Sequence, residues 1–251
     1  MKTIIPAFIC WFFLMVSVGM AGEPNLTNDS LEEAVAMLQN SVYHDHAQTF
    51  FCEALFDSEG VLTLPEGFET KGRRASDLRL AWGHIVPVEE FGPAFPEWSE
   101  GHLQCLDNKK IAFTGHACAE KTSVAFRQMQ ADMYNLYPMI NFVKEARVNH
   151  NFGMVSGVAS SFGSCQMKIG GRRMEPPAMT RGQIARTYMY MAEAYPQFVM
   201  SDYRANLMQA WDSTYPVSAW ECTRAKRIEA LQGNENSIAK AACEKKGLWG
   251  E

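Results

Sequence analysis

Two short segments hold the side chains with the clearest chemical potential. Residues 82–87 read Trp-Gly-His-Ile-Val-Pro and place His84 beside an apolar run that ends in proline. Residues 131–138 read Ala-Asp-Met-Tyr-Asn-Leu-Tyr-Pro and place Asn135 on what the pattern predicts to be a helix. A neutral imidazole can take a proton from water near pH 7, and an amide oxygen is a hard ligand suited to Mg²⁺. The two residues together could form a phosphodiesterase site with one metal ion, whereas neither residue alone would indicate one.

Each candidate also has a purely structural interpretation. An isolated histidine at a strand end is more often a hydrogen-bonded structural residue than a base. An asparagine one turn before a proline is more often a helix cap or a buried hydrogen-bonding group. Arg181 and Arg186, on one predicted helix, could contact phosphates, although a solvated arginine face is the ordinary alternative. The sequence contains no G-x-S-x-G, Walker, H-E-x-x-H or G-x-G-x-x-G motif, so those catalytic classes are not indicated.

The elements that must position these residues are mainly helical. A short strand broken by Pro87 is expected over residues 80–88, and a helix ended by Pro138 over residues 120–136. Three further helices, at about residues 31–38, 181–194 and 201–211, each begin at polar residues that can cap them. Irregular loops are expected over residues 57–80, 92–118 and 150–180.

The N-terminus predicts export. Lys2 precedes an apolar run from Ile4 to Val18 with small residues after it, which is typical of a secretory signal peptide and short for a membrane-spanning helix. We therefore expect residues 1–21 to be removed and residues 22–251 to form one domain. The mature form should make no membrane contact, and its location should be periplasmic or secreted.

Six cysteines remain in the mature chain, and an even count in an exported protein favours disulfide bonds. Cys105 and Cys118 are close enough in sequence to close one loop. The other four, Cys52, Cys165, Cys222 and Cys243, allow three pairings between which the sequence does not choose.

The formal net charge of −5 is unfavourable for binding nucleic acid, because phosphate contacts usually come from a basic surface. Local basic clusters do occur, and solvated surface charge is the ordinary interpretation of any one of them.

The whole pattern resembles the bacterial endonuclease I family of periplasmic and secreted nucleases. Besides the two segments above, the resemblance is carried in order by residues 43–52, 101–105, 118–121, 129–130, 151–152, 162–165, 175–177, 181–188, 211–212, 220–224 and 232–236. These segments cover nearly the whole mature chain.

The resemblance implies an α+β fold: a mostly helical single domain with short strands, disulfide-stapled loops and a ββα-metal nuclease core. In that family a histidine activates water, one divalent cation is bound by an asparagine and an acidic residue, and DNA and RNA are cut without strong sequence preference. Carried over, His84 is the general base and Asn135 a ligand of Mg²⁺ or another divalent cation. DNA, and RNA as a second substrate, are the expected partners of a monomeric protein.

Two departures from the family pattern qualify this expectation. The family motif Trp-Glu-His reads Trp82-Gly83-His84 here, so the acidic metal ligand is missing. Related nucleases with a D-R-G-H motif also place glycine before the histidine and hold Mg²⁺ through asparagine and water. His116 stands where relatives often have arginine, and is with Arg181 and Arg186 a candidate for substrate binding. The alternative function is a catalytically impaired relative that binds nucleic acid or a protein partner.

Overall fold

The computed structural model describes residues 22–70, 72–74, 78–147 and 150–250, so the predicted signal peptide lies outside the described residues. The first helix, α1 (Leu31–Met37), begins as predicted, because the Ser30 side chain accepts a hydrogen bond from the Glu33 N–H at 3.2 Å. The chain continues through one π-helical turn, η1 (Leu38–Val42).

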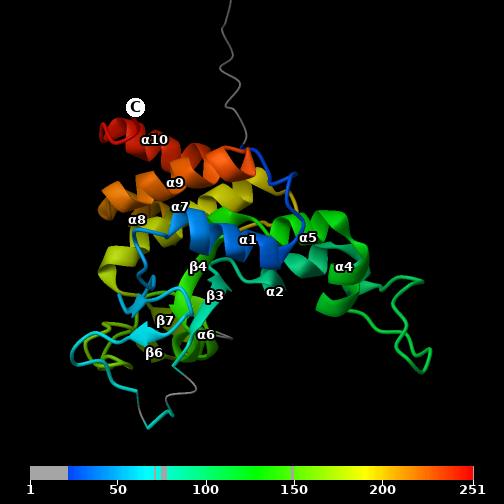
Figure 1. Ribbon diagram of the computed structural model, residues 1–251, viewed down its shortest axis with the longest axis horizontal. Helices are drawn as coiled ribbons and strands as arrows, with labels where there is room; N and C mark the ends of the chain where they lie inside the picture. The colour runs from blue at the N-terminus through cyan, green and yellow to red at the C-terminus, as the bar shows by residue number, and fades with distance from the viewer. Residues whose placement is uncertain (1–21, 71, 75–77, 148–149, 251) are drawn as a thin grey trace, which may run out of the picture.

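The strand pair β3 (Leu80–His84) and β4 (Leu136–Ile140) lies at the centre of the molecule (Figure 1). The strands are antiparallel, with Trp82 opposite Pro138 and His84 opposite Leu136. Helix α6 (Asn141–Arg147) follows β4 directly and packs against both strands. This places two strands and one helix beside His84, while the metal of the predicted ββα-metal core stays a prediction.

The single helix predicted over residues 120–136 is wrong. The segment instead forms α4 (His116–Thr122), α5 (Val124–Gln130) and a 3₁₀ turn, η4 (Met133–Asn135), before β4 begins. Ser123 has an extended backbone that separates the two helices. Pro138 does not end a helix but lies within β4, where its carbonyl accepts a hydrogen bond from the Phe50 N–H at 2.8 Å.

A layer of long helices lies over one side of the strand pair, together with α1 (Figure 1). It comprises α7 (Ala178–Ala194), α8 (Asp202–Thr214), α9 (Ala219–Gln232) and α10 (Ser237–Lys245). Helix α8 begins as predicted, with the Ser201 side chain accepting the Arg204 N–H. Helix α7 begins at Ala178, three residues before the predicted start, because Pro177 already supplies the extended residue that precedes it.

Short elements occur within and directly beside the segments predicted to be irregular. Strands β1 (Leu55–Phe56) and β2 (Leu62–Thr63) pair, and β5 (Asn151–Phe152), β6 (Lys168–Gly170) and β7 (Arg173–Glu175) form a sheet in the order β5-β7-β6. Helices α2 (Val88–Phe91) and α3 (Pro96–Ser99) flank a 3₁₀ turn, η3 (Gly92–Ala94). The loop from α3 to α4 extends away from the body of the molecule (Figure 1). The α+β class is confirmed.

Three disulfides connect these elements. The predicted Cys105–Cys118 bond is confirmed, and the remaining four cysteines pair as Cys52–Cys165 and Cys222–Cys243. Within the described ranges, no helix has the length and apolar character needed to cross a membrane.

Candidate active site

His84 ends β3 at the wall of a cavity of about 660 Å³. Gly83 and Met139 contribute from the paired strands, Lys144 and Arg147 from α6, and Gln130 from the end of α5. The same cavity is lined by His116 at the start of α4 and by Glu89 and Glu90 of α2. The strand pair and its helix therefore bring a histidine and two permanent cations to one wall.

The imidazole of His84 is held in one orientation by a backbone carbonyl. Its Nε2 lies 2.8 Å from the Gln130 carbonyl oxygen, which can only accept a hydrogen bond. Nε2 therefore carries the proton, and Nδ1 is the basic nitrogen of the ring. Burial is the main cause that lowers the pKa of His84 to about 4; the hydrogen bond to the Gln130 carbonyl opposes it, and the charges of Lys144 and Arg147 add to the lowering. His84 is consequently neutral at pH 7 and able to accept a proton.

Asn135 binds the backbone directly after His84 rather than facing the cavity. Its side chain is fully buried, its Oδ1 accepts the Val86 N–H at 2.7 Å, and its Nδ2 donates to the Val86 carbonyl at 3.0 Å. Asn135 is not among the described residues that line the cavity. The observed role of its amide is thus to fix the chain that follows β3.

The missing side chain at Gly83 leaves no empty space. A Cβ atom on Gly83 would lie 2.9 Å from Met139 Sδ and 3.4 Å from Lys144 Cδ. Lys144 is half-buried, and its aliphatic arm passes over the glycine. The position at which the family carries a carboxylate is therefore filled by a methionine and a lysine.

Arg147 lies one helical turn after Lys144 and is 8% exposed. One Nη2–H donates to the Ile85 carbonyl, and the guanidinium carbon lies 4.5 Å from the centre of the Phe152 ring. Its Nε is buried and has no hydrogen-bond partner within the described chain. This N–H is a buried donor that the described chain leaves unsatisfied.

His116 lies in this cavity, as expected of a residue near bound substrate. Its ring packs edge-on against Trp98 and Phe126, and its Nδ1 lies 3.7 Å from Glu120 Oε2. The structure thus brings His116 and His84 to one cavity, while contact of His116 with substrate stays a prediction.

A model of the family described as Endonuclease I matches residues 54–243. The chain belongs to the endonuclease I family. An extracellular deoxyribonuclease of Aeromonas hydrophila is 35% identical over 212 residues, covering 82% of this chain and 87% of that protein. A periplasmic deoxyribonuclease of the same organism is 32% identical over 247 residues, 96% of each chain. Endonuclease-1 of Buchnera aphidicola is 32% identical over 183 residues, 72% of this chain and 67% of the relative. The expected periplasmic or secreted location matches these names.

The family resemblance implies a divalent cation, but the residues around His84 do not fit one. The oxygen of Asn135 already accepts the Val86 N–H, and position 83 has no carboxylate. Glu90 is ion-paired with Arg204. Asn151 Oδ1 accepts a hydrogen bond from Arg204. The other side-chain oxygens on the cavity wall belong to the exposed carboxylate of Glu89 and to the amide of Gln130, whose oxygen is buried without a partner in the described chain. Nowhere in the described ranges do three His, Cys, Asp or Glu side chains form a group suited to a metal ion.

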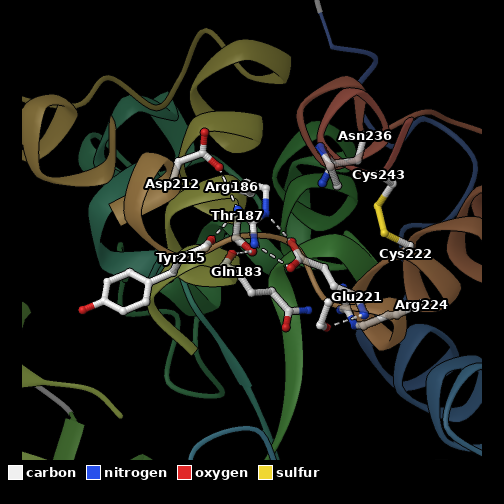
Figure 2. A network of polar contacts seen from close by, with 12 residues as sticks. Gln183, Arg186, Thr187, Asp212, Tyr215, Glu221, Cys222, Arg224, Asn236 and Cys243 are labelled. Carbon is white, nitrogen blue, oxygen red and sulfur yellow. Dashed lines mark hydrogen bonds and ion pairs between the residues drawn. A yellow bond between two sulfur atoms is a disulfide. The ribbon is translucent and has the colours of Figure 1, made fainter. Parts of the chain in front are cut away.

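Arg181 and Arg186 require a correction, because neither presents a free guanidinium to a ligand or to solvent. Arg186 is 2% exposed and binds both oxygens of Glu221, at 2.6 and 2.7 Å, and Asp212 at 2.7 Å (Figure 2). Arg181 is 8% exposed and donates to Glu175 and to the Tyr215 hydroxyl, both at 2.8 Å. Helix α7 is an internal helix, so its arginines join elements instead of meeting phosphates.

Sequence reasoning missed Lys144 and Arg147. Two basic residues three apart on a helix share one face, which is the signal that could have identified them. The predicted helix end at Pro138 concealed it, because α6 was not expected to follow a strand. Gln130 was missed for a different reason: it acts on His84 through its backbone, which any residue type provides.

Proposed function

We propose that this chain is an exported endonuclease that hydrolyses phosphodiester bonds of DNA, with His84 as the general base. The observation that carries the proposal is the Nε2–H bond from His84 to the Gln130 carbonyl, which leaves a neutral, basic Nδ1 beside a cavity. The relatives named extracellular and periplasmic deoxyribonucleases support DNA as the substrate and export as the location. RNA is proposed as a second substrate on the family resemblance.

In the proposed reaction, His84 Nδ1 removes a proton from water as the water oxygen attacks phosphorus. The new oxygen–phosphorus bond forms while the bond from phosphorus to the leaving oxygen breaks; the leaving oxygen takes up a proton from solvent water, and His84 later returns its proton to solvent. Lys144 and Arg147 face the negative charge that builds up on the phosphate oxygens. The roles predicted for Mg²⁺ and for Asn135 as its ligand stay predictions, and no step is assigned to them.

A second candidate function is supported by Gly83 and by the bonds of Asn135. A relative without the acidic ligand, and with its asparagine bound to backbone, would retain the cavity but could bind nucleic acid without cutting it. This candidate predicts binding of DNA with no cleavage under any condition.

Single-turnover cleavage of labelled duplex DNA by the wild type and by His84→Ala distinguishes the two functions. A positioned general base contributes about 10²- to 10⁴-fold, so His84→Ala should slow cleavage by that amount. His44→Ala is the matched control, because His44 is exposed and contacts its sequence neighbours, the Ser41 carbonyl and Asp45. Equal rates for the wild type and His84→Ala would remove His84 from the mechanism. No cleavage by the folded wild type, with or without Mg²⁺, would favour the binding protein.

A further inference from the structure

Lys144 and Arg147 line the His84 cavity, and their positive charges suggest how the site binds a phosphate. We propose that the Lys144 ammonium supplies the positive charge that a divalent cation would otherwise supply, so that a nucleic-acid phosphate binds between Lys144 and Arg147 without metal. The inference rests on the proposed function only for the identity of the ligand, a phosphodiester of a nucleic-acid strand.

The first support is the place of Lys144. Its Cδ lies 3.4 Å from the position that a Cβ on Gly83 would take, so the arm of Lys144 passes beside the glycine at ordinary van der Waals distance, and the close contact of such a Cβ is with Met139 Sδ at 2.9 Å. His84 is the next residue after Gly83 and shares the cavity with Lys144. The charge of Lys144 also contributes to lowering the pKa of His84, which places the ammonium within electrostatic reach of the imidazole. Gly83 and Lys144 are therefore neighbours that line the same cavity as His84.

The second support is the state of the ammonium. Lys144 takes part in none of the ion pairs between described residues, whereas Lys168 and Lys240 each pair with a glutamate. Partial burial lowers the pKa of Lys144, and the adjacent Glu145 opposes this from outside ion-pair distance. An anionic ligand would offset the unfavourable burial of this charge.

The third support is Arg147, which brings a second cation to the same wall. It is more than nine-tenths buried, and its Nε has no partner in the described part of the chain. Removing a guanidinium N–H from water without a hydrogen bond is unfavourable, and a phosphate oxygen is a strong acceptor for it. Lys144 as a point charge and Arg147 as a directional donor together suit a phosphate.

Two carboxylates, Glu89 and Glu90, line the same cavity, and the charge of Glu90 acts on Arg147. Glu90 is ion-paired with Arg204, which also donates to Asn151 Oδ1 at 2.8 Å. Glu89 is exposed to water, where its field is screened. Two cations on the wall would also repel a divalent cation placed beside His84.

The test is binding of a short fluorescent single-stranded DNA, measured by anisotropy in EDTA, with all proteins carrying His84→Ala to prevent cleavage. Lys144→Met should weaken binding by about ten- to hundredfold, the usual effect of losing a charge-assisted hydrogen bond. It should also lower the slope of log K against log salt by about 0.7, the contribution of one phosphate on a single strand. Lys245→Met, which removes an exposed lysine at the end of α10, is the matched control and should leave both quantities unchanged.

Mg²⁺ titrated into the same samples should not strengthen binding. Equal affinity for the Lys144→Met and Lys245→Met variants would overturn the inference, as would binding that is absent in EDTA and restored by Mg²⁺. Circular dichroism establishes that each variant is folded. Cleavage by the protein with native His84 is scored separately. DNA binding through Lys144 without cleavage would retain this inference and contradict the proposed hydrolysis, and Mg²⁺-dependent binding with cleavage would do the reverse.

Discussion

Asn135 positions His84 through the backbone that follows it. The amide binds both the N–H and the carbonyl of Val86, two residues after His84, and the Ile85 N–H donates to the Asn135 carbonyl at 3.0 Å. These bonds connect the end of β3 to the residue that precedes β4. The imidazole is thus held by the turn η4 as well as by its own bond to Gln130.

Replacing Asn135 should therefore destabilise the protein rather than alter its response to metal. In Asn135→Ala the buried backbone groups of Val86 lose their partners, and each unsatisfied group is unfavourable by about 1–3 kcal/mol. We expect the free energy of unfolding, from urea titration, to fall by about 2 kcal/mol or more. Asn141→Ala, whose amide makes only an exposed bond to Glu145, is the control and should change little. A fully stable Asn135→Ala protein whose cleavage requires more Mg²⁺ would instead make Asn135 a metal ligand.

At this scale the sequence predicts the residue types but not their contacts. His84 could be proposed as a base from its motif and the family resemblance, and it does lie in a cavity. The direction of the Asn135 amide could not be predicted, because it depends on the register that places His84 opposite Leu136. A buried asparagine can hydrogen-bond to the backbone or coordinate a ligand, and the sequence does not distinguish the two roles.

Among the helices, the arginines of α7 act as connections between elements. Arg186 joins α7 to Asp212 of α8 and to Glu221 of α9, and it also donates to the Tyr215 carbonyl at 3.2 Å (Figure 2). Burial alone would lower the pKa of Arg186, but the hydrogen bonds and charges of the two carboxylates raise it above its usual value. The Arg186 guanidinium therefore connects α7, α8 and α9 within the layer of long helices.

Arg186→Met should be strongly destabilising because it leaves Glu221 buried and unpaired. Breaking a buried pair from one side is unfavourable by about 3–5 kcal/mol, which urea unfolding would measure. Arg127→Met is the matched control, since Arg127 forms a largely exposed pair with Asp29 at 2.7 Å and should contribute at most about 1 kcal/mol. Adding Glu221→Gln to Arg186→Met should recover part of the loss. Near-native stability of Arg186→Met together with weakened DNA binding would return this arginine to the substrate site.

Capping residues predicted the starts of α1 and α8 correctly. The prediction failed at Pro138, where pairing with a strand distant in sequence determines the local structure. Ser30 and Ser201 accept hydrogen bonds at the two helix starts predicted from them. Pro138 was misread because a proline after an apolar run ordinarily marks a helix end. In the structure it occupies a strand that pairs with β3 on one edge, and on the other edge its carbonyl accepts the Phe50 N–H, so that its missing N–H is tolerated.

For the molecule as a whole, the disulfides close loops of very different length. Cys52 and Cys165 are 113 residues apart, whereas Cys105 and Cys118 are 13 apart and join the extended loop to α4. Cross-linking distant positions restricts the unfolded chain more than cross-linking near ones. The long connection should therefore contribute most to overall stability.

Removing each bond by a double Cys→Ser substitution tests this order. The chain-entropy relation gives about 5 kcal/mol for the Cys52–Cys165 bond and about 3 kcal/mol for the Cys105–Cys118 bond. Urea unfolding should show the larger loss for the first pair, and the folded wild type should contain no free thiol in the described chain. An equal or reversed order would mean that strain or contacts, rather than loop length, set the contribution of each bond.

The net charge of the whole chain is negative, whereas basic residues lie beside His84. The chain carries a formal net charge of −5, yet Lys144 and Arg147 place two cations beside His84. Composition could not indicate this, because it reports the sum of charges and not their positions. The two cations also affect His84 itself, since they and His116 add to the effect of burial in lowering its pKa.

The pH dependence of kcat/KM for DNA cleavage shows whether His84 is the base, because it reports the ionisation of the free enzyme. A base must be unprotonated, so kcat/KM should rise with pH around a pKa of about 4, the value to which burial lowers His84, and level off above it. The charges of Lys144, Arg147 and His116 also favour this low value, and the hydrogen bond to the Gln130 carbonyl opposes it. Glu89 and Glu90 line the same cavity. The residual activity of His84→Ala should lack this rise, with circular dichroism establishing that both proteins stay folded. A rise centred near the ordinary histidine value of about 6.5, or the same profile in both proteins, would contradict a buried, neutral His84 as the base.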